Sequence, residues 1–135
     1  MKPMVWKPEY SIHDERVDVQ HARLFELYNE ISSVPAGSID QDRLIHDLYS
    51  YAVFHFAEEE ALMATARYPE PLREAHARSH RSFFKTLERL RTQSVDTALE
   101  FFREWLAHHI LTDDKDIGRF LESTLQTDPS SPRLK

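Results

Sequence analysis

The 135-residue sequence contains no cysteine and only two glycines. A chain without cysteine can form neither a disulfide bond nor a thiolate metal site, which fits the reducing cytoplasm where we expect this protein to act. Strands joined by tight turns need more glycine than this chain offers, so the composition disfavours a β-sheet protein.

Long apolar runs and basic tracts are also missing. No apolar run approaches the roughly 20 residues that a helix needs to cross a bilayer. The 17 basic and 23 acidic residues give a net charge of −6, and the basic residues are not clustered. We therefore expect neither a membrane nor a nucleic acid as a partner, because both attract basic patches.

Apolar residues recur at intervals of three and four in four segments, a spacing typical of amphipathic helices. The segments begin near Asp14, Ser38, the Pro69–Pro71 break, and Ser94 or Asp96. Four such helices with short connections predict an all-α fold, an antiparallel up-down-up-down four-helix bundle. We expect residues 1–13 to form an extended arm packed on the bundle, residues 14–124 the bundle, and residues 125–135 a polar, flexible tail.

Polar residues interrupt the apolar face of every predicted helix. They are His21, His55 and Glu59, His76 and His80, and His109, in helix order. A buried imidazole without a partner costs about 1–3 kcal/mol, and a bound metal ion would supply the partner. The pairs His55/Glu59 and His76/His80 are each four residues apart, so each pair can converge on one centre.

Each of these residues also has a simpler interpretation. One HxxxH or HxxxE pair is more often a surface coincidence, and His21 alone is more often an ordinary core or surface histidine. Five inward-facing histidines on four helices are harder to explain without a metal. A further carboxylate lies beyond His109: regular helical spacing favours Asp113, whereas Asp114 can join only if the helix loosens or ends there.

At these residues the chain resembles the bacterial hemerythrins, over nearly all of its length from Trp6 to about Phe120. The matching segments are DVQHARLFELYN, HFAEEEALM, HARSHRSF and WLAHHILTDDK. The family pattern H…HxxxE…HxxxH…HxxxxD implies seven metal ligands: His21, His55, Glu59, His76, His80, His109 and Asp114. Two positions depart from the family: His13 stands where relatives often have glycine, and Ile117 where an aromatic residue is common.

The resemblance implies a non-haem di-iron centre, with two Fe ions bridged by Glu59, Asp114 and an oxo or hydroxo group. Three histidines would complete one iron, while His21 and His55 would leave the other with an open position. The function implied is reversible O2 binding there, as an oxygen carrier, store or delivery protein, with NO or small anions as other ligands. We expect a binding protein and not an enzyme, because the Glu-x-x-His motif of carboxylate-rich di-iron proteins is absent from the sequence.

Several alternatives stay open from the sequence. The chain could be a module that senses O2, NO or redox state for a protein partner, a di-iron peroxidase or iron-handling enzyme, or a zinc-bound or metal-free bundle. Trp105, Leu106 and Ile110 are candidates for the wall of an apolar O2 pocket, and simple core packing explains them equally well. Glu58 and Glu60 are expected to face solvent or to support the ligands from outside.

Overall fold

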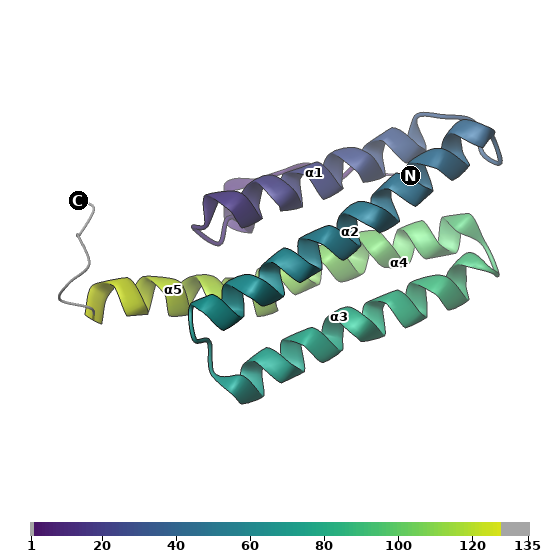
Figure 1. The fold of residues 1–135 in the computed structure, drawn as a ribbon. Coiled ribbons are helices and arrows are strands. Elements are labelled where there is room, and N and C mark those ends of the chain that lie inside the picture. The colour runs from purple at the N-terminus through teal and green to yellow at the C-terminus, as the bar shows by residue number, and fades with distance from the viewer. Residues whose placement is uncertain (1, 128–135) are drawn as a thin grey trace.

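The structure, a computed structural model, describes residues 2–127 and contains only helical elements within them. In chain order these are η1 (Pro8–Tyr10), α1 (Glu15–Ser32), α2 (Ile39–Thr65), α3 (Glu70–Arg91), α4 (Val95–His109), η2 (Ile110–Asp114) and α5 (Lys115–Thr127). Consecutive helices run antiparallel, and α4, η2 and α5 continue one another as a single rod (Figure 1). The predicted all-α four-helix bundle is confirmed, with this rod as its fourth member.

Short polar side chains fix where the helices begin. The carboxylate of Asp14 accepts a hydrogen bond from the N–H of Val17, and the hydroxyls of Ser38 and Ser94 cap α2 and α4 in the same way. Each cap pairs a backbone N–H group that has no partner inside its helix. Between α2 and α3 the chain breaks at Pro69, and α3 then carries a proline in its first turn, where no N–H is needed.

Two apolar clusters fill the bundle. The larger one runs through the part of the bundle nearer the α3–α4 connection and includes Tyr28, Phe56, Phe83 and Phe102. The smaller one consists of Met63, Tyr68 and Ile117, with half-buried neighbours around them. On α2, Glu59 lies between Phe56 of the larger cluster and Met63 of the smaller one. On the rod, Asp114 lies between Ile110 and Ile117 in the same way, so a buried polar layer separates the two clusters.

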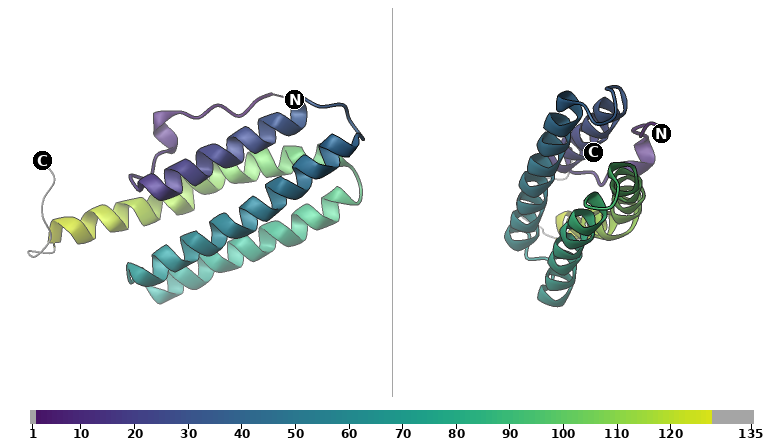
Figure 2. Two further views of the ribbon diagram at one scale, coloured as in Figure 1. Left: turned by 45° about the horizontal axis from the view of Figure 1, so that its top comes forward. Right: turned by 90° about the vertical axis from the view of Figure 1, so that its right-hand side faces the viewer.

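The N-terminal arm, defined here as residues 2–13, runs back along the bundle over α1 and α4 (Figure 2). Both backbone polar groups of Met4 bond to the side-chain amide of Asn29, at 2.8 Å each. Near its end, Ser11 and the N–H of Ile12 donate to the carboxylate of Asp18. The arm is thus tied to α1 at both ends.

His13 has a φ of 63°, a departure from the range usual for residues other than glycine. This left-handed backbone conformation is the one that glycine adopts without steric cost. His13 is exposed, and its Nε2 lies 3.7 Å from the Glu122 carboxylate. The departure therefore adds backbone strain but no side chain to the core.

Residues 125–127 belong to α5. The rest of the tail predicted over residues 125–135 lies outside the described residues. Among the described residues, no helix is both long enough and apolar enough to cross a membrane.

Gly118 provides a test of how the arm meets the rod. A Cβ atom there would lie 2.4 Å from the carbonyl oxygen of Ile12. We expect overpacking in Gly118→Ala to lower the free energy of unfolding by about 1–3 kcal/mol. The higher helix preference of alanine offsets up to about 1 kcal/mol of this loss. Urea unfolding measures this, with the exposed Ser82→Ala as control; a Gly118→Ala protein of unchanged or higher stability would contradict the close contact.

Candidate metal centre

All seven side chains singled out from the sequence lie in one buried cluster. Glu59, His76, His80 and His109 bring ligand atoms within 4.8 Å of one another, and so do His21, His55, Glu59 and Asp114. None is more than 5% exposed. Glu59 belongs to both groups, so the cluster is a pair of adjoining sites. We call them the three-histidine site and the two-histidine site.

Glu59 turns one carboxylate oxygen toward each site. Its Oε1 lies 2.7 Å from Nε2 of His76 and 3.1 Å from Nε2 of His80. Its Oε2 faces the other way, 3.3 Å from Nε2 of His55 and 3.7 Å from Nε2 of His21. A carboxylate placed in this way can bind two cations at once.

Asp114 has the same arrangement from the opposite side. Its Oδ1 lies 3.1 Å from Nε2 of His76 and 3.3 Å from Nε2 of His109, whereas Oδ2 lies 3.0 Å from Nε2 of His21. Two carboxylates therefore span the two sites, each with one oxygen per site.

The reach of Asp114 depends on a local loosening of the rod. Residues Ile110–Asp114 form a π-helical turn, in which the N–H of Lys115 bonds to the carbonyl of Ile110, five residues back. A π turn holds one more residue than an α turn and is frequent at functional sites. The extra residue brings Asp114 onto the face of His109, although it follows by five positions. Asp113 is turned outward instead, with its Oδ2 3.2 Å from Nδ1 of His109.

The three-histidine site has nitrogen spacings typical of coordination. Nε2 of His109 lies 3.0 Å from Nε2 of His76 and 3.2 Å from Nε2 of His80. Two nitrogens bound at right angles to one ion, with bonds of about 2.1 Å, lie about 3 Å apart. Three imidazole nitrogens this close compete for the same protons, so hydrogen bonding alone does not explain the arrangement.

The outer nitrogens of three imidazoles contact acceptors that fix the ring orientation. Nδ1–H of His55 donates to Oε1 of Gln20 at 2.7 Å, and Nδ1–H of His80 donates to a carboxylate oxygen of Glu60 at 2.8 Å. The carboxylate of Asp113 contacts the outer nitrogen, Nδ1, of His109 in the same way. Because these acceptors hold the proton on Nδ1, the lone pair of Nε2 faces the cluster.

Unpaired buried atoms indicate what the cluster is suited to bind. Both ring nitrogens of His21, Nε2 of His55, Oε2 of Glu59 and both oxygens of Asp114 are buried without a hydrogen-bond partner within the described residues. Buried polar atoms are rarely left so. Nitrogen and carboxylate donors of this kind suit first-row transition metals, so the residues fit a pair of such ions.

The electrostatics of the imidazoles favour positive charge in the cluster. Burial lowers the pKa of His21 and His76, but the carboxylates of Asp114 and Glu59 outweigh burial and raise each pKa to about 9. Burial lowers the pKa of His109 too, but Asp114 and, on its outer side, Asp113 outweigh burial and raise this pKa to about 11.

The carboxylates respond in the opposite sense. Burial raises the pKa of Glu59, but the surrounding histidines outweigh it and hold the pKa well below its usual range. The pKa of Asp114 is likewise lowered, against both burial and the charge of Glu59, by His109 and His21. Burial alone lowers the pKa of His55 more than Glu59 raises it. Two ionised carboxylates in a buried site call for compensating cations.

Aromatic rings enclose the three-histidine site. Phe56 stacks on His80, with ring centroids 4.0 Å apart, and the indole of Trp105 stacks on His109 at 4.3 Å. Trp105, a candidate for the pocket wall, therefore contacts a histidine of the three-histidine site. Leu106 and Ile110, the other candidates, are buried in the larger apolar cluster. On the two-histidine side, the ring of Phe56 lies 5.4 Å from that of His55, and Trp6 of the arm lies 6.5 Å from His21.

Sequence reasoning missed Gln20 entirely and assigned Asp113 only as a competitor of Asp114. Gln20 precedes His21, so its position on the helix predicts no contact with the centre, and only the structure reveals its bond to His55. Glu60 was expected to face solvent or to support the ligands. Its side chain is 42% exposed and also contacts His80, so it does both.

A helical bundle with two adjoining histidine–carboxylate sites defines a class of protein, the four-helix metal-binding bundles. The domain family described as "Hemerythrin HHE cation binding domain" matches residues 13–121. The chain belongs to the hemerythrin family, as its resemblance predicts.

Named relatives agree with this assignment. The chain is 29% identical over 126 residues to a bacteriohemerythrin of Clostridium acetobutylicum, covering 83% of this chain and 96% of that protein. It is 32% identical over 125 residues to a bacteriohemerythrin of Stenotrophomonas maltophilia, covering 85% and 79%. A myohemerythrin of Theromyzon tessulatum is 27% identical over 119 residues, covering 87% and 94%.

The shifted pKa values predict how the chelator-treated protein responds to pH. His21 and His76 have pKa values of about 9, and His109 about 11, against 6.5 for an ordinary histidine. A raised histidine pKa stabilises the fold fully below pH 6.5, and this contribution is lost as the pH rises through 9 to 11. We expect the free energy of unfolding to fall between pH 6.5 and 9.5 by more than about 1.4 kcal/mol, which is the energy equivalent of a shift of one pKa unit.

Urea unfolding at the two pH values measures this loss. The metal-loaded protein is the matched control, since a bound ion keeps the imidazoles deprotonated and removes the pH dependence. Greater stability of the chelator-treated protein at pH 9.5 than at 6.5 would contradict the charge balance described for the cluster.

Proposed function

We propose that this protein binds O2 reversibly at a non-haem di-iron centre and serves as a cytoplasmic oxygen carrier, store or delivery protein. The proposed iron ligands are His21, His55, Glu59, His76, His80, His109 and Asp114. The observation that carries the proposal is that Glu59 and Asp114 each direct one oxygen to each of two histidine groups. A single ion could not use both oxygens of both carboxylates together with five imidazoles.

The two proposed iron positions differ in the number of protein ligands. Three histidines and Oε1 of Glu59 gather at one position, with Oδ1 of Asp114 3.1 Å from Nε2 of His76. Two histidines and one oxygen from each carboxylate gather at the other. The position beside His21 and His55 therefore has one protein ligand fewer, and a small molecule binds there. When bound, the iron pair supplies the electrons that O2 binding requires.

The surrounding residues orient the ligands and exclude water. His21 and His55 are fully buried, and Gln20 holds the proton of His55 on the outer nitrogen. Leu106 and Ile110 are the proposed apolar wall of the O2 pocket, because both are buried in the cluster that adjoins the centre. Trp105 supports the centre differently, by stacking on His109.

The ligand set favours binding over oxidation chemistry. Five neutral imidazoles and two carboxylates carry less negative charge than carboxylate-rich di-iron sites, so they stabilise highly oxidised iron less well. Reversible binding, and not substrate oxidation, is the function that this donor set supports best. We therefore do not propose an enzymatic activity.

Iron analysis and spectroscopy test this function directly. We expect two irons per chain after iron-replete expression, because two sites share the bridging carboxylates. Anaerobic reduction followed by air should produce a visible absorption band that disappears when O2 is removed. An iron content near zero, a preference for zinc, or an unchanged spectrum in air would each contradict the proposal.

Asp113 and Asp114 form a matched pair for testing the ligand assignment. We expect Asp114→Asn to lower the iron content to one ion or fewer per chain, because it removes a charged bridge between the two positions. Asp113→Asn should retain both ions with an affinity about 10–100-fold weaker, since Asp113 contacts only the outer nitrogen of His109. Equal iron loss in both variants would contradict the distinction.

A further inference from the structure

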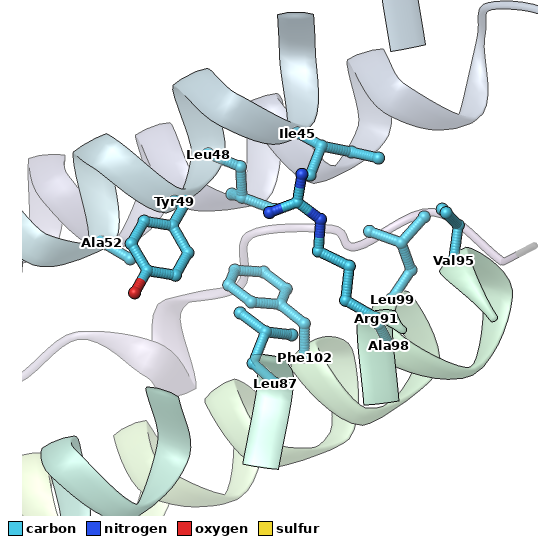
Figure 3. Close-up of a pocket in the computed structure, with 10 residues that line it drawn as sticks. All are labelled: Ile45, Leu48, Tyr49, Ala52, Leu87, Arg91, Val95, Ala98, Leu99 and Phe102. Atoms are coloured by element: carbon cyan, nitrogen blue, oxygen red, sulfur yellow. The ribbon is translucent and has the colours of Figure 1, made fainter. Parts of the chain in front are cut away.

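A small apolar cavity lies within the bundle toward the end where α3 connects to α4 (Figure 3). Its volume is about 30 Å³. The residues that line it are Ile45, Leu48, Tyr49, Ala52, Leu87, Arg91, Val95, Ala98, Leu99 and Phe102. They belong to α2, to α3 and to α4, so the cavity is built by three of the four helices and lies apart from the metal cluster.

Small side chains at inward-facing positions create the space. Ala52 on α2 and Ala98 on α4 are both buried, and a larger residue at either position would extend into the cavity. Leu48, Leu99 and Phe102 form the rest of the buried wall and belong to the larger apolar cluster. Folded interiors contain few voids larger than a water molecule, so a cavity of this size is a distinct feature of the core.

The chemistry of the wall decides what can occupy the cavity. Its only polar side chains belong to Tyr49 and Arg91, which are not buried. A water molecule inside needs two to four hydrogen-bond partners, and the buried part of this wall supplies none, so the cavity favours an apolar occupant. Room for one water takes about 10–15 Å³, so 30 Å³ accommodates a molecule of about two heavy atoms.

We propose that this cavity is a docking site for a small apolar gas molecule, with O2 as its physiological occupant. Dry apolar cavities bind such molecules because the occupant restores dispersion contacts that the wall atoms otherwise lack. The choice of O2 among apolar gases rests on the proposed function, whereas the gas site itself rests only on the cavity.

A gas molecule can reach the cavity past the side chain of Arg91. Figure 3 shows this side chain extended from the end of α3 toward α2, beside Ile45. Arg91 is exposed, and its one ion pair, with Glu88, is 3.8 Å long and also exposed. An exposed side chain changes rotamer within nanoseconds, so a gas molecule can enter without any helix moving.

The cavity and the metal cluster share their helices. Ala52 precedes His55 by less than one turn of α2, and Phe102 precedes His109 by about two turns of α4. Buried side chains of the same apolar cluster fill the space between them. A docked molecule is therefore held in the same apolar cluster, one to two helical turns from the histidines of α2 and α4.

Xenon is the probe for the cavity, because it binds apolar voids and needs no iron. We expect crystals of the metal-loaded protein under xenon pressure to show one xenon site bounded by Leu48, Leu99 and Phe102. Ala98→Leu fills the space and should abolish that site. The matched control Ala75→Leu, at an exposed position of α3, should retain it. Absence of xenon from the cavity in the unaltered protein, or its persistence in Ala98→Leu, would overturn the inference.

A second variant enlarges the space and so avoids the risk of overpacking. Leu87→Ala removes a partly buried side chain from the wall, and we expect severalfold higher xenon occupancy at the same pressure. Unchanged or lower occupancy would count against the site.

The identity of the physiological occupant is tested kinetically. We expect the rate of O2 association with the reduced protein to fall severalfold in Ala98→Leu but not in Ala75→Leu, at equal iron content. An unchanged rate in Ala98→Leu would overturn O2 as the occupant. Failure of the proposed function gives a different result, because xenon would still bind while no variant responded to O2.

Discussion

Two buried carboxylates shared between two groups of histidines are the constraint on which the rest of the structure depends. Glu59 and Asp114 are fully buried, and an isolated carboxylate in such surroundings would be very costly. The negative charge of each carboxylate is compensated by imidazoles from other helices. All four helices of the bundle must therefore place a histidine at the same depth. The capped helix starts, the proline break before α3 and the π turn in the rod all serve to bring these donors to the same depth.

Much of this arrangement could be predicted from the sequence because helical periodicity is simple. His21, His55, Glu59, His76 and His80 fall on the apolar stripes, and the structure buries every one of them. Periodicity could not choose between Asp113 and Asp114, because the choice depends on a π turn that no spacing rule anticipates. Gln20 was missed for another reason: its contact with His55 joins two helices, and a single-helix pattern contains no information about such pairs. The ligand roles themselves stay predictions until iron is measured.

The polar layer divides the interior unequally. The larger cluster contains Phe56, Phe83 and Phe102 among its many aromatic residues, and it also encloses the small cavity. On the other side of the layer, Ile117 packs with Met63 and Tyr68. Tyr68 and Phe120 stack edge to face, 5.2 Å apart, within this smaller cluster. An aliphatic residue at position 117 is thus accommodated where neighbouring rings already cover the rod.

The wide turn after His109 has one more consequence. A regular helix would present a single aspartate to this imidazole, but the π turn presents two consecutive ones, Asp114 to the inner nitrogen and Asp113 to the outer. Trp105 stacks on one face of the His109 ring. The two aspartates and Trp105 therefore restrain both ring nitrogens and one ring face. A ring restrained in this way resists turning over, so its inner nitrogen keeps pointing toward the cluster.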